Sequence, residues 1–360
     1  MRKRIGISTG GGDAPGVNAV IRAATLGSIE RGWDVIGIQR GFAGLLDVND
    51  TVVLDRDAVR GITNRGGTIL GTDNRGHPFD ERVRDEEGQE RVVDRLDEAV
   101  KGAENLGLDA LIVIGGDGTM KLAHRLYERG VPVVGVPKTI DNDLAGTVVT
   151  FGFDTAATVA TEAIDRLHST AESHQRVFVV ELMGRHAGWI ALYAGIAAGA
   201  DIVLIPEIPF HWKAVFRKVR EREAMGRRFA IAVVAEGAAP CGGEPTYVPV
   251  KPGAAERLGG IAERVAQAIA EETGKETRSL VLGHLQRGGV PTARDRVLAL
   301  RFGAAAVRIV EAGHFGTMVA LDPPDVRTVP LVEAISGMKT VPLDGDTILT
   351  ARELGICLGE

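Results

Sequence analysis

The sequence has little cysteine, few aromatic residues and no long apolar run. Its two cysteines, Cys241 and Cys357, lie far apart and show no CxxC or metal-ligand spacing, so ordinary reduced thiols are favoured over a disulfide or redox role. Aromatic residues make up 4% of the 360 residues, which leaves few stacking platforms for bases. The apolar stretch after the basic start breaks at residues 10–12, before it reaches the length of a signal peptide or a membrane span. We therefore expect a cytoplasmic protein without a membrane partner.

Acidic residues outnumber basic ones. The formal net charge is −6, whereas a general nucleic-acid binder needs clustered Lys and Arg for the phosphate backbone. A small ligand is the better partner. Glycine, by contrast, is abundant at 47 residues, which fits many tight strand-to-helix turns that contact a ligand through the backbone.

Apolar runs of strand length alternate with longer amphipathic segments. The expected strands are residues 5–9, 35–39, 110–114, 133–136, 177–182, 202–205, 230–235 and 280–282. The expected helices are residues 15–31, 120–129, 154–171, 186–198, 212–225, 259–272 and 294–311. This alternation predicts an α/β fold of mostly parallel sheets covered by helices, and the chain length favours two domains. We interpret the highly charged residues 79–95 as a solvated surface excursion.

A glycine-rich turn at residues 9–18 follows the first expected strand and opens a helix. Free backbone N–H groups and the helix dipole favour an anion there, and glycine lets a phosphate approach the main chain. A tight corner without a ligand is the alternative. The turn is not a dinucleotide fingerprint, because the G-x-G-x-x-G spacing fails at Pro15.

A second glycine turn, at residues 115–119, carries a carboxylate. Asp117 could hold Mg²⁺, because a nucleoside triphosphate is transferred as its magnesium complex and this hard cation needs oxygen ligands. The alternative is that Asp117 caps a helix that begins near Met120.

A third motif, at residues 137–143, follows another apolar strand. In extended chain Thr139, Asp141 and Asp143 project to the same side, which presents a hydroxyl and two carboxylates together. One carboxylate can take the proton of an attacking sugar hydroxyl, and repulsion between the two would raise the basicity of the pair. An Asx-rich turn is the alternative.

Arginines gather in three further segments, at residues 173–176, 181–186 and 277–289. The guanidinium fork matches phosphate oxygens and can stabilise the charge of a transferring phosphoryl group. Surface salt bridges are the alternative for any one arginine. Glu236 and His284 could accept hydrogen bonds from sugar hydroxyls.

Taken together, the motifs GGDAPG, GGDG, TIDND, HQR, MGR, ETR and GHLQRGG, in this order across residues 11–289, resemble the 6-phosphofructokinase family. GGDG alone also occurs in NAD and lipid kinases, but the joint match is specific. The resemblance implies two Rossmann-like doubly wound domains with the active site in the cleft between them. It assigns residues 1–152 plus about 287–336 to a nucleotide and magnesium domain, and residues 153–286 plus about 337–360 to a sugar-phosphate domain.

The resemblance also implies roles for individual residues. Asp141 would deprotonate the sugar 1-hydroxyl beside Thr139 and Asp143, and Arg185 would stabilise the transferring phosphoryl group. The implied substrate-binding residues are Thr139, Asp141, Arg176, Met183, Gly184, Arg185, Glu236, Arg278, His284 and Arg287. Among these, His284 and Arg287 would grip the 6-phosphate, and Arg176 and Arg278 would come from the neighbouring subunit of a homodimer or homotetramer. The implied nucleotide-binding residues are Gly12, Arg75, Asp117, Gly118 and Thr119, with Asp117 as the metal ligand for Mg²⁺.

The resemblance gives two opposing indications of the phosphoryl donor. Gly118 leaves room for the α-phosphate of ATP, where pyrophosphate users carry aspartate, whereas Lys138 resembles the lysine of pyrophosphate users. We expect transfer from ATP to fructose 6-phosphate, giving fructose 1,6-bisphosphate in glycolysis, because an aspartate repels α-phosphate directly and a lysine does not exclude it. The alternatives are a pyrophosphate-dependent enzyme, an NAD-kinase-like enzyme and a non-catalytic sugar-phosphate sensor.

Overall fold

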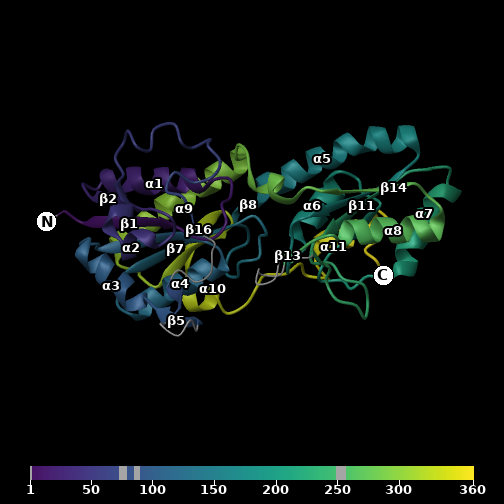
Figure 1. The fold of residues 1–360 in the computed structure, drawn as a ribbon. Helices are drawn as coiled ribbons and strands as arrows, with labels where there is room; N and C mark the ends of the chain where they lie inside the picture. The colour runs from purple at the N-terminus through teal and green to yellow at the C-terminus, as the bar shows by residue number, and fades with distance from the viewer. Residues whose placement is uncertain (1, 73–78, 85–89, 249–256) are drawn as a thin grey trace. The chain divides into compact units, whose positions relative to one another are not determined.

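The computed structural model describes residues 2–72, 79–84, 90–248 and 257–360. The chain divides into two compact units (Figure 1). Unit 1 comprises Met1–Ile140, Leu144–Asp154 and Arg287–Met338, and unit 2 comprises Asp141–Asp143, Thr155–Gln286 and Lys339–Glu360.

Unit 1 is built on an eight-stranded sheet. Its strands, in order across the sheet, are β16 (Asp325–Pro330), β15 (Thr317–Asp322), β7 (Val133–Thr139), β6 (Ala110–Gly115), β1 (Arg4–Thr9), β2 (Asp34–Ile38) and β3 (Thr51–Val53), and β8 (Phe151–Gly152) pairs with β7. The central strands run parallel, and the edge strands β3 and β16 run antiparallel to their neighbours. β6 is buried at every residue, as expected for a continuous apolar strand covered on both faces. The predicted α/β architecture of mostly parallel strands is confirmed.

Helices cover both faces of this sheet (Figure 1). On one face lie α1 (Val17–Ile29) and α9 (Ala293–Ala312), and on the other lie α3 (Leu96–Asn105), α4 (Asp117–Glu128) and α10 (Leu331–Ala334). The short helix α2 (Ala43–Leu46) packs against α3. α1 and α9 pack closely because Gly303 has no side chain: a Cβ there would lie 2.6 Å from the carbonyl oxygen of Val20.

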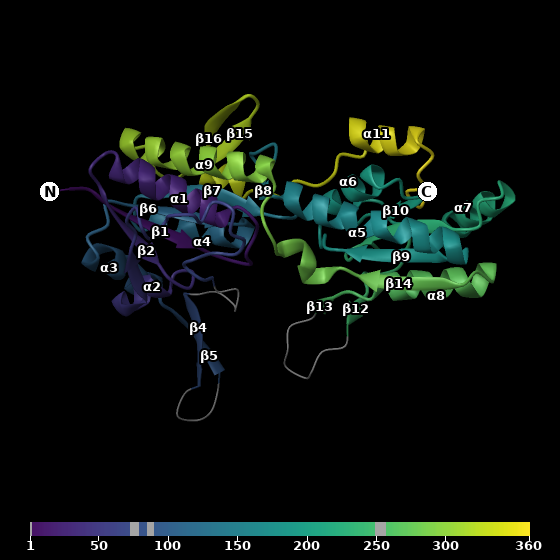
Figure 2. The ribbon, with the colours of Figure 1, turned by 90° about the horizontal axis from the view of Figure 1, so that it is seen from above.

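Unit 2 has a smaller sheet whose strands are all parallel. Their order is β10 (Ile202–Leu204), β11 (Ala230–Ala235), β9 (Val177–Leu182) and β14 (Thr277–Val281). Figure 2 shows α6 (Trp189–Ala197) and α11 (Asp346–Glu353) on the side of the sheet opposite α8 (Ile261–Thr273). α7 (Trp212–Ala224) packs against α8, and α5 (Phe153–His174) is the longest helix of the described chain. A small antiparallel pair, β12 (Tyr247–Val248) and β13 (Arg257–Leu258), completes the unit.

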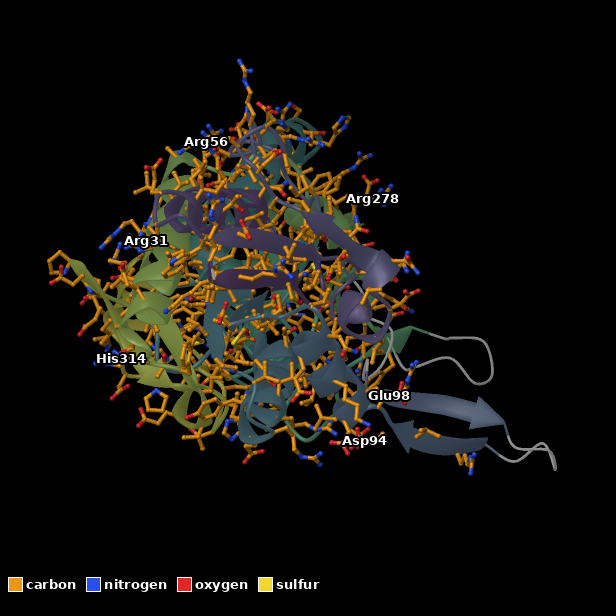
Figure 3. The ribbon with its side chains drawn as sticks, turned by 90° about the vertical axis from the view of Figure 1, so that its left-hand side faces the viewer. Arg31, Arg56, Asp94, Glu98, Arg278 and His314 are labelled. Carbon is orange, nitrogen blue, oxygen red and sulfur yellow. The ribbon has the colours of Figure 1, made fainter. Side chains whose placement is uncertain are left out.

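Within the charged stretch 79–95, the described residues form two antiparallel strands, β4 (Asp80–Arg84) and β5 (Glu90–Asp94). Phe79, at its start, is fully buried, and its ring centroid lies 5.2 Å from that of Phe42. Asp94 and Glu98 lie near each other where β5 passes into α3 (Figure 3). The stretch is therefore anchored in the core at its base, which the interpretation as a solvated excursion did not foresee.

Several elements were not expected from the sequence. These are β3, β4, β5, β8, β12, β13, β15, β16, α2, α3, α10 and α11, besides two short 3₁₀ helices. β14 begins three residues before the expected strand at 280–282. β14 is an edge strand in which no residue is buried, so its apolar pattern is weak.

Within the described residues, no helix combines the length and apolar composition needed to cross a membrane.

Candidate active site

Two glycine-rich turns meet in unit 1, at the carboxyl ends of β1 and β6. These strands are neighbours, and the sheet order reverses between them because β2 lies on the other side of β1. The Gly10 N–H donates to the Ile114 carbonyl at 2.9 Å, which joins the turns. A Cβ on Gly10 would lie 2.7 Å from Cγ2 of the buried Thr119, and one on Gly115 would lie 2.3 Å from its Cβ. Close packing of the turns thus requires both glycines, at the point where α/β sheets bind ligands.

Two cations from distant parts of the chain lie against the turn after β1. Lys138, on β7 and 4% exposed, donates to the Gly12 carbonyl. Arg287 donates to the Asp13 carbonyl at 3.2 Å, and a Cβ on Gly12 would lie 2.8 Å from its Nη1. Gly12 therefore lies beside two positive charges, which favours an anionic ligand at this turn. The predicted nucleotide residue Arg75 lies outside the described residues.

Asp117 is the first residue of α4, and Gly116 is its N-cap without a side-chain cap bond. The alternative that Asp117 caps a helix from Met120 is therefore wrong, because the helix begins three residues earlier. The Asp117 carboxylate instead contacts the Lys121 ammonium at 2.7 Å, one turn along the helix. Its side chain is 29% exposed, so it remains open to a further ligand.

This carboxylate fits a magnesium ion that arrives with phosphate. Among the described residues no group of three or more His, Cys, Asp or Glu could hold a metal ion. Mg²⁺, however, is usually held by one or two carboxylates together with substrate phosphates and water. Asp117, in the second glycine turn and at a helix N-terminus, supplies one such carboxylate.

The motif at residues 139–143 is not extended chain throughout, although β7 runs three residues beyond the expected strand at 133–136. β7 ends at Thr139, and Asn142 has φ of +53°, in the left-handed region. The expectation of extended chain through Asp143 is thus wrong, because Asn tolerates the left-handed conformation and turns the chain there. The exposure pattern nevertheless alternates, with Thr139, Asp141 and Asp143 partly exposed and the residues between them buried.

In unit 2 the loop after β9 and the end of β11 lie side by side. The Glu236 N–H donates to the Leu182 carbonyl at 2.9 Å, and the Gly237 N–H donates to the Gly184 carbonyl at 3.1 Å. A Cβ on Gly237 would lie 2.0 Å from the Arg185 carbonyl oxygen, so only glycine allows this approach. The contacts bring the predicted sugar-site residues Gly184, Arg185 and Glu236 together, next to Met183.

Glu236 has the most strongly shifted carboxyl of this group. Burial raises its pKa from 4.5 to about 7, and the negative charges of Asp141 and Glu181 act in the same direction. A hydrogen bond from the Gly184 backbone and the positive charge of Arg185 lower the pKa in part. Perturbation by burial and by named charged neighbours is typical of functional sites.

The two arginines predicted to serve a neighbouring subunit share one carboxylate. Arg176 Nε lies 2.8 Å and Arg278 Nη2 lies 2.5 Å from oxygens of Glu276, and the hydrogen bond and charge of Arg176 lower the pKa of Glu276. Arg278 is labelled in Figure 3, and its side chain is 54% exposed. His284 belongs to unit 2 and Arg287 to unit 1, so their joint grip on a 6-phosphate stays a prediction.

Comparison with known proteins identifies the family. A protein-family model described as phosphofructokinase matches residues 4–310. The chain belongs to the phosphofructokinase family. The resemblance carried by the sequence motifs is therefore confirmed.

Relatives within the phosphofructokinase family differ in their phosphoryl donor. An ATP-dependent 6-phosphofructokinase of Chloroflexus aggregans is 54% identical over 100% of this chain and 98% of its own length. A pyrophosphate–fructose 6-phosphate 1-phosphotransferase of Amycolatopsis methanolica is 52% identical over 94% of this chain and 96% of its own length. The solved phosphofructokinase of Pichia pastoris in the T-state has a TM-score of 0.79 and 35% identity, and the match covers 93% of this chain and 36% of that longer chain.

Sequence reasoning missed one ionisable residue beside the phosphofructokinase motif at 139–143. The Lys339 ammonium donates to Oδ1 of Asn142 at 2.8 Å. Burial lowers the pKa of Lys339 from 10.5 to about 8, and the charge of Asp143 partly offsets this. No sequence signal could have found it, because Lys339 lies in none of the motifs and almost 200 residues from Asn142 along the chain.

Proposed function

We propose that this chain is an ATP-dependent 6-phosphofructokinase, which transfers the terminal phosphate of ATP to the 1-hydroxyl of fructose 6-phosphate. The observation that carries the proposal is the Asp141 carboxylate, which interacts electrostatically with Glu236 in a member of this family. Asp141 is proposed as the general base, and general bases contribute about 10²- to 10⁴-fold to rate.

Each residue of the proposed site has a chemical task. Asp141 takes the proton of the 1-hydroxyl, which makes that oxygen the nucleophile. Arg185 stabilises negative charge on the phosphoryl group in transfer. Glu236, ionised above its pKa of about 7, accepts hydrogen bonds from sugar hydroxyls. Thr139, Asp143, Met183 and Gly184 complete the sugar side, with His284 and Arg287 on the 6-phosphate.

The donor site is proposed at the turns after β1 and β6. Backbone N–H groups near Gly12 and Thr119 would bind phosphate oxygens, with Lys138 nearby as a cation. Asp117 would hold Mg²⁺, which, when bound, neutralises charge on the donor phosphates. Arg75 is proposed to contact the nucleotide by resemblance alone.

Gly118 supports ATP as the donor. Its backbone needs no glycine, because its φ does not lie in the left-handed region, and a Cβ added there would meet nothing within 4 Å. Glycine in a helix lowers stability by about 0.5–1 kcal/mol relative to alanine. Because neither the backbone nor the packing requires glycine at position 118, its presence supports a ligand that lies against it. Lys138 does not exclude ATP, because a buried ammonium beside the turn attracts the phosphates of either donor.

The proposal includes an oligomer with shared sites. Arg176 and Arg278 would contact the substrate of a neighbouring subunit in a homodimer or homotetramer. The edge strand β14, on which Arg278 lies, also exposes Leu280 and Val281, which suits a contact surface. We further propose a cytoplasmic enzyme without nucleic-acid or membrane partners.

Initial rates test both the acceptor and the donor. With fructose 6-phosphate and Mg²⁺, we expect a higher kcat/KM for ATP than for pyrophosphate. Asp141→Asn should lower kcat by about 10²- to 10⁴-fold and leave substrate binding in place. The matched control, Asp165→Asn, changes an exposed aspartate of α5 in the same unit and should leave the rate unchanged.

The outcomes separate the rival functions. Faster turnover with pyrophosphate would reverse the donor assignment. Phosphorylation of NAD in place of fructose 6-phosphate would indicate an NAD-kinase-like enzyme. Binding of fructose 6-phosphate without turnover in the wild type would indicate a sensor.

A further inference from the structure

Lys339 contacts the segment that carries Asp141 at two points. The Lys339 N–H donates to the Asp143 carbonyl at 2.8 Å, and the Lys339 ammonium donates to Oδ1 of Asn142 at 2.8 Å. Lys339 thus donates hydrogen bonds to residues 142 and 143 from both its backbone and its side chain. All of these residues belong to unit 2.

Lys339 is itself fixed on its other side. The indole Nε1 of Trp189 donates to the Lys339 carbonyl at 3.1 Å, and the ammonium lies 5.8 Å from the centroid of the indole ring. Two residues further on, the Val341 N–H donates to Oε1 of Glu207 at 2.9 Å. The Glu207 carboxylate also accepts the Gly188 N–H, at 3.0 and 3.1 Å.

Residues 339–341, which we call the strap, therefore join two predicted parts of the sugar site. One end of the strap holds the 141–143 segment. The other end is tied, through Glu207 and Trp189, to residues 188–189, which follow the loop that carries Arg185. The strap thus contacts both the segment of Asp141, the proposed base, and the residues that follow Arg185, the proposed phosphoryl-stabilising arginine.

Such support is needed because the 141–143 segment lies outside the sheet. β7 ends at Thr139, so Asp141 lies beyond the last residue that the strand ladder fixes. Asn142 has φ of +53°, a conformation that persists only where the surroundings hold it. Its side chain is 4% exposed, and the Lys339 ammonium satisfies its Oδ1 there.

We propose that Lys339 is a positioning residue for catalysis, which holds Asn142 and Asp143 and thereby sets the Asp141 carboxylate for proton abstraction. The inference rests on the proposed function, in which Asp141 is the base. A misplacement of about 1 Å costs on the order of 10²-fold in rate, so the loss of this grip should lower kcat more than it weakens substrate binding.

The charge of Lys339 gives the role a pH signature. Burial lowers its pKa to about 8, and Asp143 opposes the shift. On its other side it faces the Trp189 ring, and Glu207 reaches the strap at Val341. Asp141, Arg185, Glu236 and Glu181 are further ionisable residues of unit 2, coupled to one another through Glu236. The ammonium is charged below about pH 8 and neutral above it, so the wild-type kcat should fall as pH rises through about 8.

The test compares Lys339→Met and Lys339→Arg with the wild type, as kcat and KM for fructose 6-phosphate and ATP across about pH 6 to 10. We expect Lys339→Met to lower kcat by about 10- to 100-fold at neutral pH, with KM values changed by less than about threefold. Lys339→Arg should recover part of the rate and lose the fall near pH 8, because guanidinium stays charged. Lys218→Met is the matched control: this lysine of unit 2 donates to the Gly355 carbonyl, far in sequence from any motif, and its loss should leave kcat unchanged.

A second variant keeps the inference testable if Lys339→Met does not fold. Asn142→Gly retains the left-handed backbone but removes the acceptor of the ammonium, so it too should lower kcat and lose the fall near pH 8. If Lys339 acts through Asn142, the double variant should be no slower than the slower single variant.

Other results would overturn the inference. They are a Lys339→Met enzyme with kcat within about twofold of the wild type, a loss confined to KM, and independent, multiplying effects in the double variant. A wild-type chain that does not phosphorylate fructose 6-phosphate with either donor would instead refute the proposed function.

Discussion

At the residue scale, Glu236 combines burial with a negatively charged neighbour. Its pKa of about 7 means that the side chain gains a proton as pH falls through neutrality. The ionised form accepts hydrogen bonds at both oxygens, whereas the neutral acid accepts fewer and more weakly. We therefore expect KM for fructose 6-phosphate to rise as pH falls below about 7.

Glu236→Gln supplies the comparison, because glutamine does not titrate. Its KM should be higher than that of the wild type above about pH 7, and the rise of KM at lower pH should be reduced to what titration of the substrate phosphate causes. A rise as steep as in the wild type would contradict the role of Glu236.

The raised pKa of Glu236 also predicts that the free energy of unfolding decreases as pH rises. A carboxyl whose folded pKa lies above its unfolded value contributes stability below about pH 4.5, and this contribution is lost as pH rises through about 7. Glu236→Gln should therefore gain thermal stability relative to the wild type above pH 7, as differential scanning calorimetry would measure.

Individual residues also show where sequence reasoning stops. The spacing of Thr139, Asp141 and Asp143 singled out three residues of one motif, but the extended chain assumed for them is absent. Asn142 turns the backbone there. Its side chain accepts a hydrogen bond from Lys339, a tertiary neighbour that no local pattern contains.

At the element scale, two substitutions of Gly118, in the first turn of α4, test its effect on stability and on donor choice separately. Gly118→Ala should raise the free energy of unfolding by about 0.5–1 kcal/mol, because the position is helical and the added Cβ meets nothing within 4 Å. Gly118→Asp should fold equally well but lower kcat/KM for ATP by more than that for pyrophosphate, because its carboxylate repels α-phosphate.

Denaturant unfolding and initial rates with the two donors measure both effects. The donor assignment to Gly118 fails if Gly118→Asp changes the two kcat/KM values equally. A loss of stability in Gly118→Ala would mean that the glycine has a conformational role.

Elements differ in how far the sequence predicts them. The central strands β1, β6, β7, β9 and β11 were predicted, because they are almost entirely buried and their sequences are mainly apolar. β3 and β16 were missed because edge strands expose one side and mix polar with apolar residues. The start of α4 was predicted three residues too late, because Asp117 and Gly118 are weak helix formers. They belong to the helix because Thr119, the next residue, packs against Gly10 and Gly115.

At the scale of the whole molecule, the proposed sharing of sites between subunits predicts complementation. Asp141→Asn and Arg278→Ala should each be nearly inactive alone. In mixed oligomers, one site would then receive an intact Asp141 from one chain and an intact Arg278 from the other. Activity should reappear when the two variants are refolded together.

The matched control mixes Asp141→Asn with Arg185→Ala, two residues proposed to serve the same chain's site, and should recover nothing. Native mass spectrometry would verify that hybrids form. Hybrids without recovered activity in the first mixture would mean that Arg278 acts within its own chain or not at all.

The sequence by itself determined the α/β class, the parallel central strands and the family, because these depend on local apolar runs and on short motifs that read independently of one another. Only the tertiary structure decided what surrounds the motifs: Lys138 and Arg287 at Gly12, Glu236 beside Arg185, and Lys339 on Asn142. These pairs are separated by 51 to 275 positions along the chain. Burial and charge at such pairs arise only when the sheets assemble, and they shift the pKa values of Glu236 and Lys339 toward neutrality.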